Sequence, residues 1–216
     1  MTTEIRAVLF DFGGVILSSP IDGFRDYERE ALLPAGFIQR INTINPDHNA
    51  WACMERGEID EATFHERFQA EGLALGYKFD SRAVLARVTG TLRPEMVAVV
   101  RRCRARYHVS CLTNNMQLRF GPAMAQDPAH AAEIDEVMAL FEHVVESSKI
   151  GARKPEPRFF VKACEIAGVV PEHCVFLDDL GINLKPARAL GMTTIKVGDP
   201  AQAITDLEAV LGHPVR

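Results

Sequence analysis

Five short runs of β-branched and bulky apolar residues constrain the fold of this chain more than any other feature. The runs are AVLFD, VSCLT, HVVE, CVFLD and TTIKV, at residues 7–11, 109–113, 143–146, 174–178 and 193–197. Their almost unbroken apolar character is typical of parallel strands that are covered on both faces. Helical patterns follow the later runs, at residues 155–168 and 183–191. This alternation predicts an α/β fold with a doubly wound parallel sheet.

Nearly a hundred residues separate the first two runs, far more than one crossover helix needs. Four stretches of this insert place apolar residues three and four positions apart, with charges between them, at residues 21–33, 34–44, 48–57 and 59–76. We therefore expect a small helical cap over residues 18–89. The core would then consist of residues 1–17 and 90–216.

Two short segments, residues 17–20 and 88–92, are expected to join the cap to the core. Pro20 and Gly90 suit a role as hinges there. The loosest segment of the chain, residues 121–135, is expected to form a surface loop that leads into a helix.

The composition is that of an ordinary globular protein, with 47% hydrophobic and 25% charged residues among 216. A formal net charge of −5 counts against a nucleic-acid partner, because the longest basic run, RRCRAR at 101–106, is short. The five cysteines lack the C-x-x-C spacing of zinc sites, so reduced thiols are expected. Without a signal-peptide pattern or a long apolar stretch, we expect a cytoplasmic protein with no membrane span.

Polar side chains lie at the ends of the predicted strands. Ligands of parallel α/β sheets bind at this edge, so these residues are the candidates for function. They are Asp11, Thr113, Asn114, the loop residue Lys154, Asp178 and Asp179. Carboxylates, a hydroxyl and an amine at one edge indicate a site for phosphate and a metal ion.

Four motifs carry a resemblance to a known family. FDFGGV, CLTNN, ARKPEP and VFLDDLGINLKPARALGMTTIKV resemble the nucleophile, hydroxyl, lysine and acidic motifs of the haloacid dehalogenase superfamily. With GEIDEATF in the insert, the chain is most similar to the amino-terminal phosphatase domains of soluble epoxide hydrolases and the comparable domain of acyl-CoA dehydrogenase family member 10. The resemblance implies a Rossmann-like core with a C1-type cap. It also implies magnesium-dependent hydrolysis of a phosphomonoester or acyl phosphate.

The resemblance assigns the nucleophile and the metal ligands. Asp11 would attack phosphorus and form an aspartyl-phosphate intermediate. The cofactor would be Mg²⁺, held by Asp11, the backbone carbonyl of Gly13, and Asp178 or Asp179.

Other motif residues would bind the phosphoryl group. Thr113, Asn114 and Gly14 would donate hydrogen bonds, and Lys154 would neutralise the nucleophile or the phosphate. Asn183 would orient a carboxylate or a metal-bound water, or would simply be a helix N-cap.

Gly13 departs from the resembled phosphatases, which carry at this position an aspartate that protonates the leaving group. General acid and base catalysis contributes about 10²- to 10⁴-fold in rate, so low or unusual activity is expected. A cap residue such as His48 or His65, a water molecule or the substrate itself would replace the missing acid.

Two alternatives remain open. One is a non-catalytic regulatory module that binds phosphate and metal. The other is a 2-haloacid dehalogenase, since a departing halide needs no proton, with Arg25 or Arg29 of the cap holding the substrate carboxylate. For the favoured interpretation, the partner is a small phosphorylated metabolite or acyl phosphate, with no nucleic acid or membrane, and the protein is a monomer or homodimer.

Overall fold

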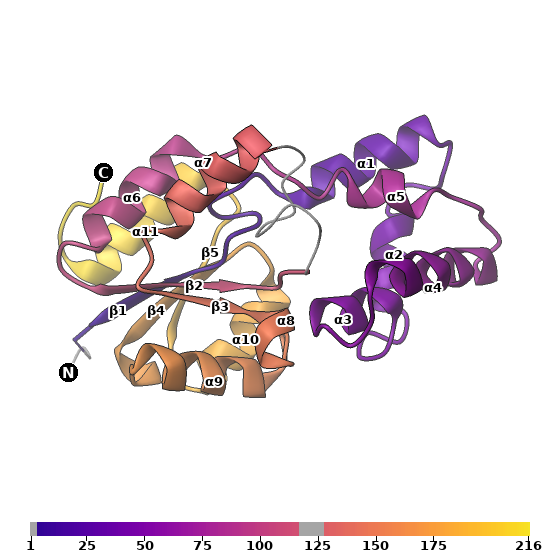
Figure 1. Ribbon diagram of the computed structural model, residues 1–216. Coiled ribbons are helices and arrows are strands. Elements are labelled where there is room, and N and C mark those ends of the chain that lie inside the picture. Colours follow the sequence, from indigo (N-terminus) through magenta and orange to yellow (C-terminus); the bar gives the residue numbers. More distant parts are fainter. Residues whose placement is uncertain (1–3, 117–127) are drawn as a thin grey trace.

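A five-stranded parallel sheet forms the centre of the protein (Figure 1). The computed structural model describes residues 4–116 and 128–216. Its strands, in the spatial order β3-β2-β1-β4-β5, are β1 (Ala7–Phe10), β2 (His108–Thr113), β3 (His143–Glu146), β4 (Cys174–Asp178) and β5 (Thr193–Lys196). The predicted α/β class and parallel sheet are confirmed.

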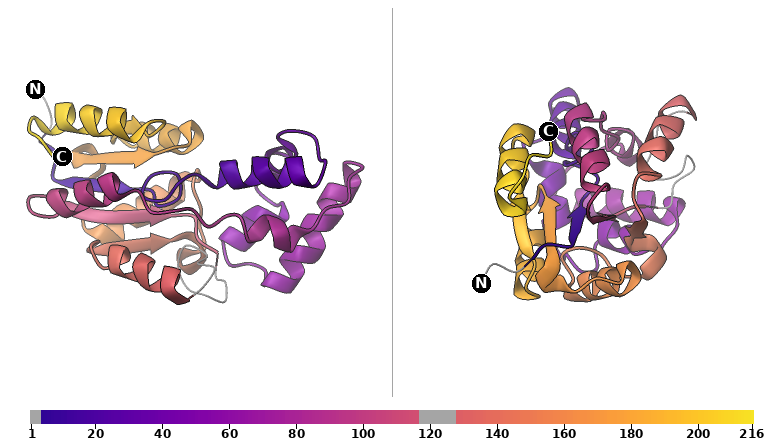
Figure 2. Two further views of the ribbon diagram at one scale, coloured as in Figure 1. Left: turned by 90° about the horizontal axis from the view of Figure 1, so that it is seen from above. Right: turned by 90° about the vertical axis from the view of Figure 1, so that its left-hand side faces the viewer.

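Helices cover both faces of the sheet (Figures 1 and 2). One layer contains α6 (Pro94–Cys103), α7 (Pro128–Met138) and α11 (Pro200–Leu211). The other contains α8 (Ser147–Ile150), α9 (Pro157–Ala167) and α10 (Gly181–Ala189), and a short 3-10 helix, η2 (Pro171–His173), precedes β4. Alternate residues of β1 pack into the two layers, Val8 and Phe10 on one side and Ala7 and Leu9 on the other. This double burial explains the unbroken apolar runs.

A group of helices with its own hydrophobic cluster lies between β1 and α6 in the sequence. These helices are α1 (Pro20–Glu30), α2 (Phe37–Thr43), α3 (Ala50–Glu55), α4 (Glu61–Ala74) and α5 (Ser81–Leu85). Trp51 packs edge-on against Phe64, with ring centroids 5.7 Å apart, in the interior of this helical insert. Sequence periodicity did not predict α5, because five residues are too few to show a helical repeat; its N-cap is the Asp80 carboxylate. The division into a cap of 18–89 and a core stays a prediction.

The two connections between the insert and the sheet run side by side. Leu17 and Leu92 form an antiparallel bridge, and the Ser18 amide donates to the Thr91 carbonyl at 2.8 Å. A Cβ atom on Gly90 would lie only 2.5 Å from the Ser18 carbonyl oxygen. Glycine at this position therefore permits the close approach of the two segments.

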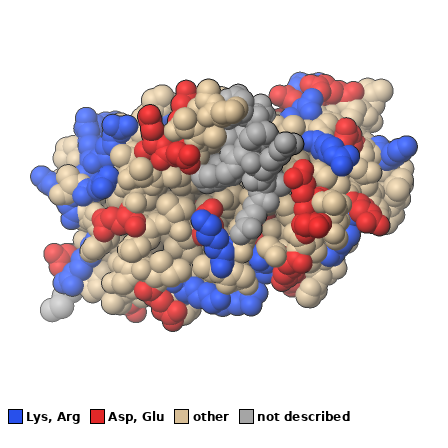
Figure 3. All heavy atoms as spheres, in the orientation of Figure 1, with Lys and Arg blue, Asp and Glu red and all other residues tan. Residues whose placement is uncertain are grey.

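The carboxyl ends of the strands face the helical insert, and both ends of the chain lie at the far end of the core (Figures 1 and 2). The surface loop predicted over residues 121–135 falls partly outside the described residues, and α7 begins at Pro128. All five cysteines are buried free thiols. Among the described residues, none of the helices is both long and apolar enough to span a bilayer. Acidic and basic side chains are mixed over the face drawn in Figure 3.

Candidate active site

Two carboxylates lie side by side at the carboxyl ends of the neighbouring strands β1 and β4. Asp11 directly follows β1, and its amide donates to the carbonyl of Leu177 in β4 at 2.8 Å. Asp178 is the last residue of β4 and is fully buried. Asp179 follows, and one oxygen from each of these three aspartates lies within 4.8 Å of the others. The parallel register of the sheet thus creates a compact acidic cluster at its carboxyl edge.

Lys154 connects the two strand ends. Its Nζ atom lies 2.6 Å from Oδ1 of Asp11 and 2.9 Å from Oδ2 of Asp178. The lysine is 1% exposed, and its ammonium group lies 5.6 Å from the centre of the Phe176 ring. Burial without partners would make this charge very unfavourable, so its two carboxylate contacts are what stabilise it there.

Burial and neighbouring charges shift the pKa values of Asp11, Asp179 and Lys154. Burial, reinforced by the neighbouring charge of Asp178, raises the pKa of Asp11 well above its usual value, even though Lys154 opposes the shift. The same two causes raise the pKa of Asp179 to about 6. Burial would lower the pKa of Lys154, but the carboxylates of Asp11 and Asp178 raise it. When ionised, the three carboxylates leave two negative charges that the lysine does not balance.

This donor set fits a divalent cation. Three carboxylates with oxygens within 4.8 Å of one another offer the hard oxygen ligands that Mg²⁺ prefers. Burial is the main cause of the raised pKa values of Asp11 and Asp179, and repulsion by the charge of Asp178 adds to both shifts. A bound cation would relieve this repulsion and favour the ionised carboxylates.

Asn183 holds the innermost carboxylate in place. It is the third residue of α10, and its Nδ2 atom lies 3.0 Å from both oxygens of Asp178. The Leu180 amide also donates to Oδ1 of Asp178, at 2.8 Å. The alternative in which Asn183 is a helix N-cap is wrong, because Leu180 occupies the N-cap position.

The two glycines that follow Phe12 differ in the space around them. Gly14 has a φ of 78°, and a Cβ there would lie 2.2 Å from Oδ2 of Asp179. Glycine is therefore needed at this position for both backbone conformation and space. A Cβ on Gly13, in contrast, would meet nothing within 4 Å among the described residues. In the part of the chain that the structure describes, no atom thus occupies the place where an aspartate is expected in the resembled phosphatases.

Thr113 and Asn114 lie at the same edge of the sheet. Thr113 is the last residue of β2 and is 7% exposed. The side chain of Asn114 forms two hydrogen bonds with the backbone of Lys154. Its Nδ2 donates to the lysine carbonyl at 2.9 Å, and its Oδ1 accepts from the lysine amide at 2.8 Å. Hydrogen bonds between Asn114 and Lys154 thus link the CLTNN motif to the ARKPEP motif.

Two residues of the connecting segments also touch the site, and sequence patterns did not predict them. The Ser19 hydroxyl donates to Oδ2 of Asp179 at 3.3 Å. Arg93 donates from Nη1 to the carbonyl of Gly14 at 2.6 Å. Their only sequence signal is their nearness to the predicted hinges, which does not indicate the direction of a side chain.

The contacts of the described residues do not connect the insert residues considered as acids or anion ligands to the acidic cluster. His65 is buried inside the insert, where its Nδ1 is 2.9 Å from the Ser81 hydroxyl, and His48 is exposed. Arg25 and Arg29 are exposed on α1, and each pairs with an aspartate three residues before it, Asp22 and Asp26 respectively.

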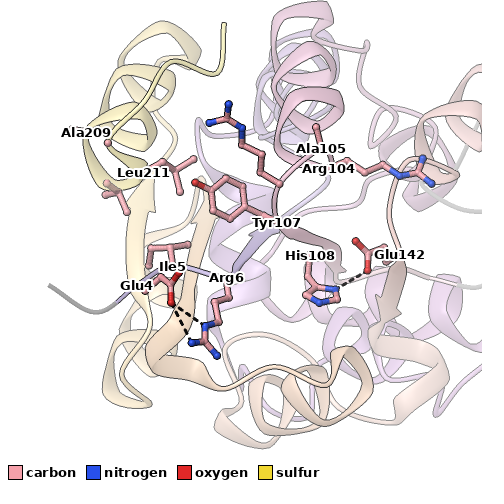
Figure 4. A pocket seen from close by; sticks show the side chains of 13 residues that line it. Glu4, Ile5, Arg6, Arg104, Ala105, Tyr107, His108, Glu142, Ala209 and Leu211 are labelled. Atoms are coloured by element: carbon pink, nitrogen blue, oxygen red, sulfur yellow. Dashed lines mark hydrogen bonds and ion pairs between the residues drawn. The ribbon is translucent and has the colours of Figure 1, made fainter.

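A cavity of about 1010 Å³ lies at the opposite end of the strands from the acidic cluster (Figure 4). Four of the residues that line it form two pairs, Arg6 with Glu4 at 3.1 Å and His108 with Glu142 at 2.7 Å. Figure 4 shows these pairs within the cavity lining. The cavity is therefore separate from the acidic cluster.

Comparisons with known proteins agree with this geometry. The family model described as haloacid dehalogenase-like hydrolase matches residues 5–191. Acyl-CoA dehydrogenase family member 10 of Mus musculus is 34% identical over 97% of this chain. Bifunctional epoxide hydrolase 2 of Sus scrofa is 28% identical over 96% of it. The chain spans only 19% and 39% of the lengths of these two proteins, respectively.

Solved structures share the fold. A haloacid dehalogenase family enzyme from Bacteroides thetaiotaomicron, in complex with magnesium and inorganic phosphate, aligns with a TM-score of 0.60 and 22% identity. The alignment covers 90% of this chain and 96% of that one. Phosphatases are also among the sequence relatives of the chain.

Proposed function

Because the chain belongs to the haloacid dehalogenase-like hydrolases, we propose that it is a magnesium-dependent phosphatase that uses Asp11 as its nucleophile. Its substrate is a small phosphorylated metabolite or an acyl phosphate. The observation that carries the proposal is the position of Lys154, whose Nζ contacts Asp11 and Asp178 in a cluster with Asp179. The enzyme of known structure that binds magnesium and phosphate supports it.

Asp11 is oriented for an attack through one oxygen. Both hydrogen bonds that the described residues give its side chain fall on Oδ1, from the Phe12 amide at 2.7 Å and from Lys154. Oδ2 thus keeps its lone pairs for phosphorus. The Oδ2–P bond forms as the bond to the leaving oxygen breaks, and water then cleaves the acyl phosphate to release inorganic phosphate and regenerate the carboxylate.

Charge neutralisation makes this attack feasible. Asp11, the Gly13 carbonyl, and Asp178 or Asp179 would hold Mg²⁺, which would supply positive charge to the phosphoryl oxygens. Lys154 neutralises Asp11, which would otherwise repel an anionic substrate. Thr113, Asn114 and Gly14 lie at the edge from which hydrogen bonds reach the phosphoryl group, and Asn183 keeps Asp178 in place.

The absence of an acidic side chain at Gly13 determines which leaving groups the proposed enzyme would favour. No side chain at this position protonates the departing oxygen, and the open space there accommodates water or part of the substrate. Acyl phosphates, whose leaving carboxylates need little protonation, should therefore react faster than alkyl phosphates.

Gly13 also favours a second candidate function, a regulatory module that binds phosphate and Mg²⁺ without turnover. The dehalogenase alternative gains no similar support. Arg25 and Arg29 pair with aspartates of their own helix, and the acidic pair at 178–179 suits a metal ion rather than a halide.

Several broader assignments belong to the same proposal. We assign residues 18–89 to a cap and residues 1–17 and 90–216 to the core, consistent with a hydrophobic cluster built from insert residues together with one core residue, Met116. A cytoplasmic location agrees with five buried free thiols. The protein works as a monomer or homodimer on a small molecule.

Phosphate release from a panel of alkyl and acyl phosphates tests the function. Native protein should release phosphate with Mg²⁺ and not with EDTA, and Asp11→Asn should abolish release. Tight binding of inorganic phosphate without release from any substrate would favour the regulatory module instead. Halide release from a 2-haloacid that persists in EDTA would support the dehalogenase.

A further inference from the structure

Two consecutive residues of the helical insert pair with the two charged residues that flank Lys154. Glu55, the last residue of α3, contacts Arg153, with 2.5 Å between Oε2 and Nε. Arg56 contacts Glu156, with 3.3 Å between Nη1 and Oε1. The charges are complementary along the two segments. We call residues 151–156, between α8 and α9, the lysine loop. The charges of Arg153 and Glu156 in this loop are opposite in sign to those of the two residues that they contact at the end of α3.

Both oxygens of the Glu55 carboxylate have hydrogen-bond or ion-pair partners where the insert meets the core. Its side chain is only 10% exposed. Besides Arg153, its Oε2 atom accepts a hydrogen bond from Nδ2 of Asn114 at 3.1 Å. Its Oε1 atom accepts from the indole nitrogen of Trp51 at 3.0 Å. One buried carboxylate thus joins the aromatic interior of the insert to two loops of the core.

Asn114 transmits this contact to the catalytic lysine. The Nδ2 atom that donates to Glu55 also donates to the Lys154 carbonyl, and its Oδ1 accepts from the Lys154 amide. Lys154 in turn holds Asp11 and Asp178. Hydrogen bonds from Glu55 through Asn114 to the Lys154 backbone, followed by the lysine side chain itself, therefore connect the insert to the proposed nucleophile.

The backbone of the same segment fits closely against the core. The Glu55 carbonyl accepts from the Ser147 hydroxyl at 2.6 Å. A Cβ atom on Gly57, which has a φ of 70°, would lie 2.9 Å from the Ser148 carbonyl oxygen. Both serines belong to α8, which directly precedes the lysine loop. The contact between insert and core is thus centred on Glu55.

We propose that Glu55 is a positioning residue that makes the placement of Asn114 and Lys154 depend on docking of the insert. The proposal rests on the proposed function of this site. When α3 docks, Glu55 orders Asn114 and Arg153, and the backbone of Lys154 is held for catalysis. When α3 moves away, Arg153 loses its partner and the lysine loop loosens. Substrate turnover is thereby coupled to enclosure of the site.

The test compares Glu55→Ala and Glu55→Gln with Glu66→Ala, which removes an exposed carboxylate from α4 of the same insert. Hydrogen exchange of residues 150–157 and steady-state kinetics are measured for each. Glu55→Ala should speed exchange in the lysine loop and lower kcat by about 10- to 100-fold, with a smaller change in KM. Glu55→Gln, which keeps one acceptor oxygen in place of two, should recover part of both losses, and Glu66→Ala should match the native protein.

A double-mutant cycle with Arg153→Ala isolates the coupling. The loss in the combined variant should be smaller than the sum of the two single losses, because both changes break the contact between Glu55 and Arg153, while Glu55→Ala also removes the contacts with Asn114 and Trp51. Unchanged exchange at 150–157 in Glu55→Ala, or additive effects in the cycle, would overturn the proposal. Exchange does not depend on turnover, so an absence of phosphatase activity would refute the proposed function while the exchange data still decide the role of Glu55.

Discussion

At the scale of single residues, one buried ammonium group faces three carboxylates. Lys154 balances part of their charge, and the remainder matches the charge of one divalent cation. Residue types and strand ends alone predicted these four side chains, because parallel strands bring their carboxyl ends together. The contacts of Ser19, Arg93 and Glu55 could not be predicted in this way, since they depend on how a long insert folds back.

Gly14→Ala should damage both stability and metal binding. Any residue with a Cβ loses about 1–2 kcal/mol in the left-handed conformation, and here the Cβ would also collide with Asp179. Gly168→Ala is the matched control, because Gly168 has a φ of 64° with nothing within 4 Å. Urea denaturation should show a larger loss for Gly14→Ala than for the control. Equal losses would mean that Asp179 moves aside freely.

Gly13→Asp should restore a proton donor to the site. The added side chain starts in open space, and a working acid contributes about 10²-fold or more in rate. We expect faster release from alkyl phosphates and little change for acyl phosphates, measured as kcat for both classes. An equal effect on the two classes would show that leaving-group protonation is not what Gly13 limits.

At the scale of elements, the strands were easier to predict than the helices. The apolar runs match β1 to β5 to within one residue at each end, because burial on both faces leaves a continuous signal. The α9 and α10 helices were also predicted, although α10 begins at Gly181 rather than Asn183. The short α5 was missed. Its position depends on Asp80 and on packing within the insert.

Gly90→Ala should disturb the paired connections. The new Cβ would lie 2.5 Å from the Ser18 carbonyl, and overpacking of this kind costs about 1–3 kcal/mol. Gly198→Ala, at a position with nothing within 4 Å, should change the free energy of unfolding by less than about 0.5 kcal/mol. Limited proteolysis should cut Gly90→Ala faster than the control near the connections. Identical cleavage rates would contradict a tight pairing of these segments.

At the scale of the whole molecule, the site lies where the carboxyl edge of the sheet meets the helical insert. The insert has its own hydrophobic cluster, and it reaches the core through paired connections and through α3. In the proposed function, the sheet supplies the reacting groups and the insert encloses the substrate. The large cavity at the opposite end of the strands takes no part in this division.

Mg²⁺ should stabilise the folded protein because the acidic cluster exists only in that state. At a concentration of about 100 times Kd, binding adds about 2.7 kcal/mol to the free energy of unfolding. Thermal denaturation at constant ionic strength should therefore show a higher Tm with Mg²⁺. The increase should shrink in Asp179→Asn and persist in Asp206→Asn, which alters an exposed carboxylate of α11. The same increase in both variants would place the bound ion elsewhere.

In the proposed mechanism Asp11 carries the phosphoryl group. To detect this intermediate, the protein is quenched with acid during turnover of ³²P-labelled acetyl phosphate, and its peptides are mapped. We expect Mg²⁺-dependent label on the peptide that contains Asp11, and none in Asp11→Asn. Phosphate release without label on this peptide, or label on another residue, would show that Asp11 is not the nucleophile.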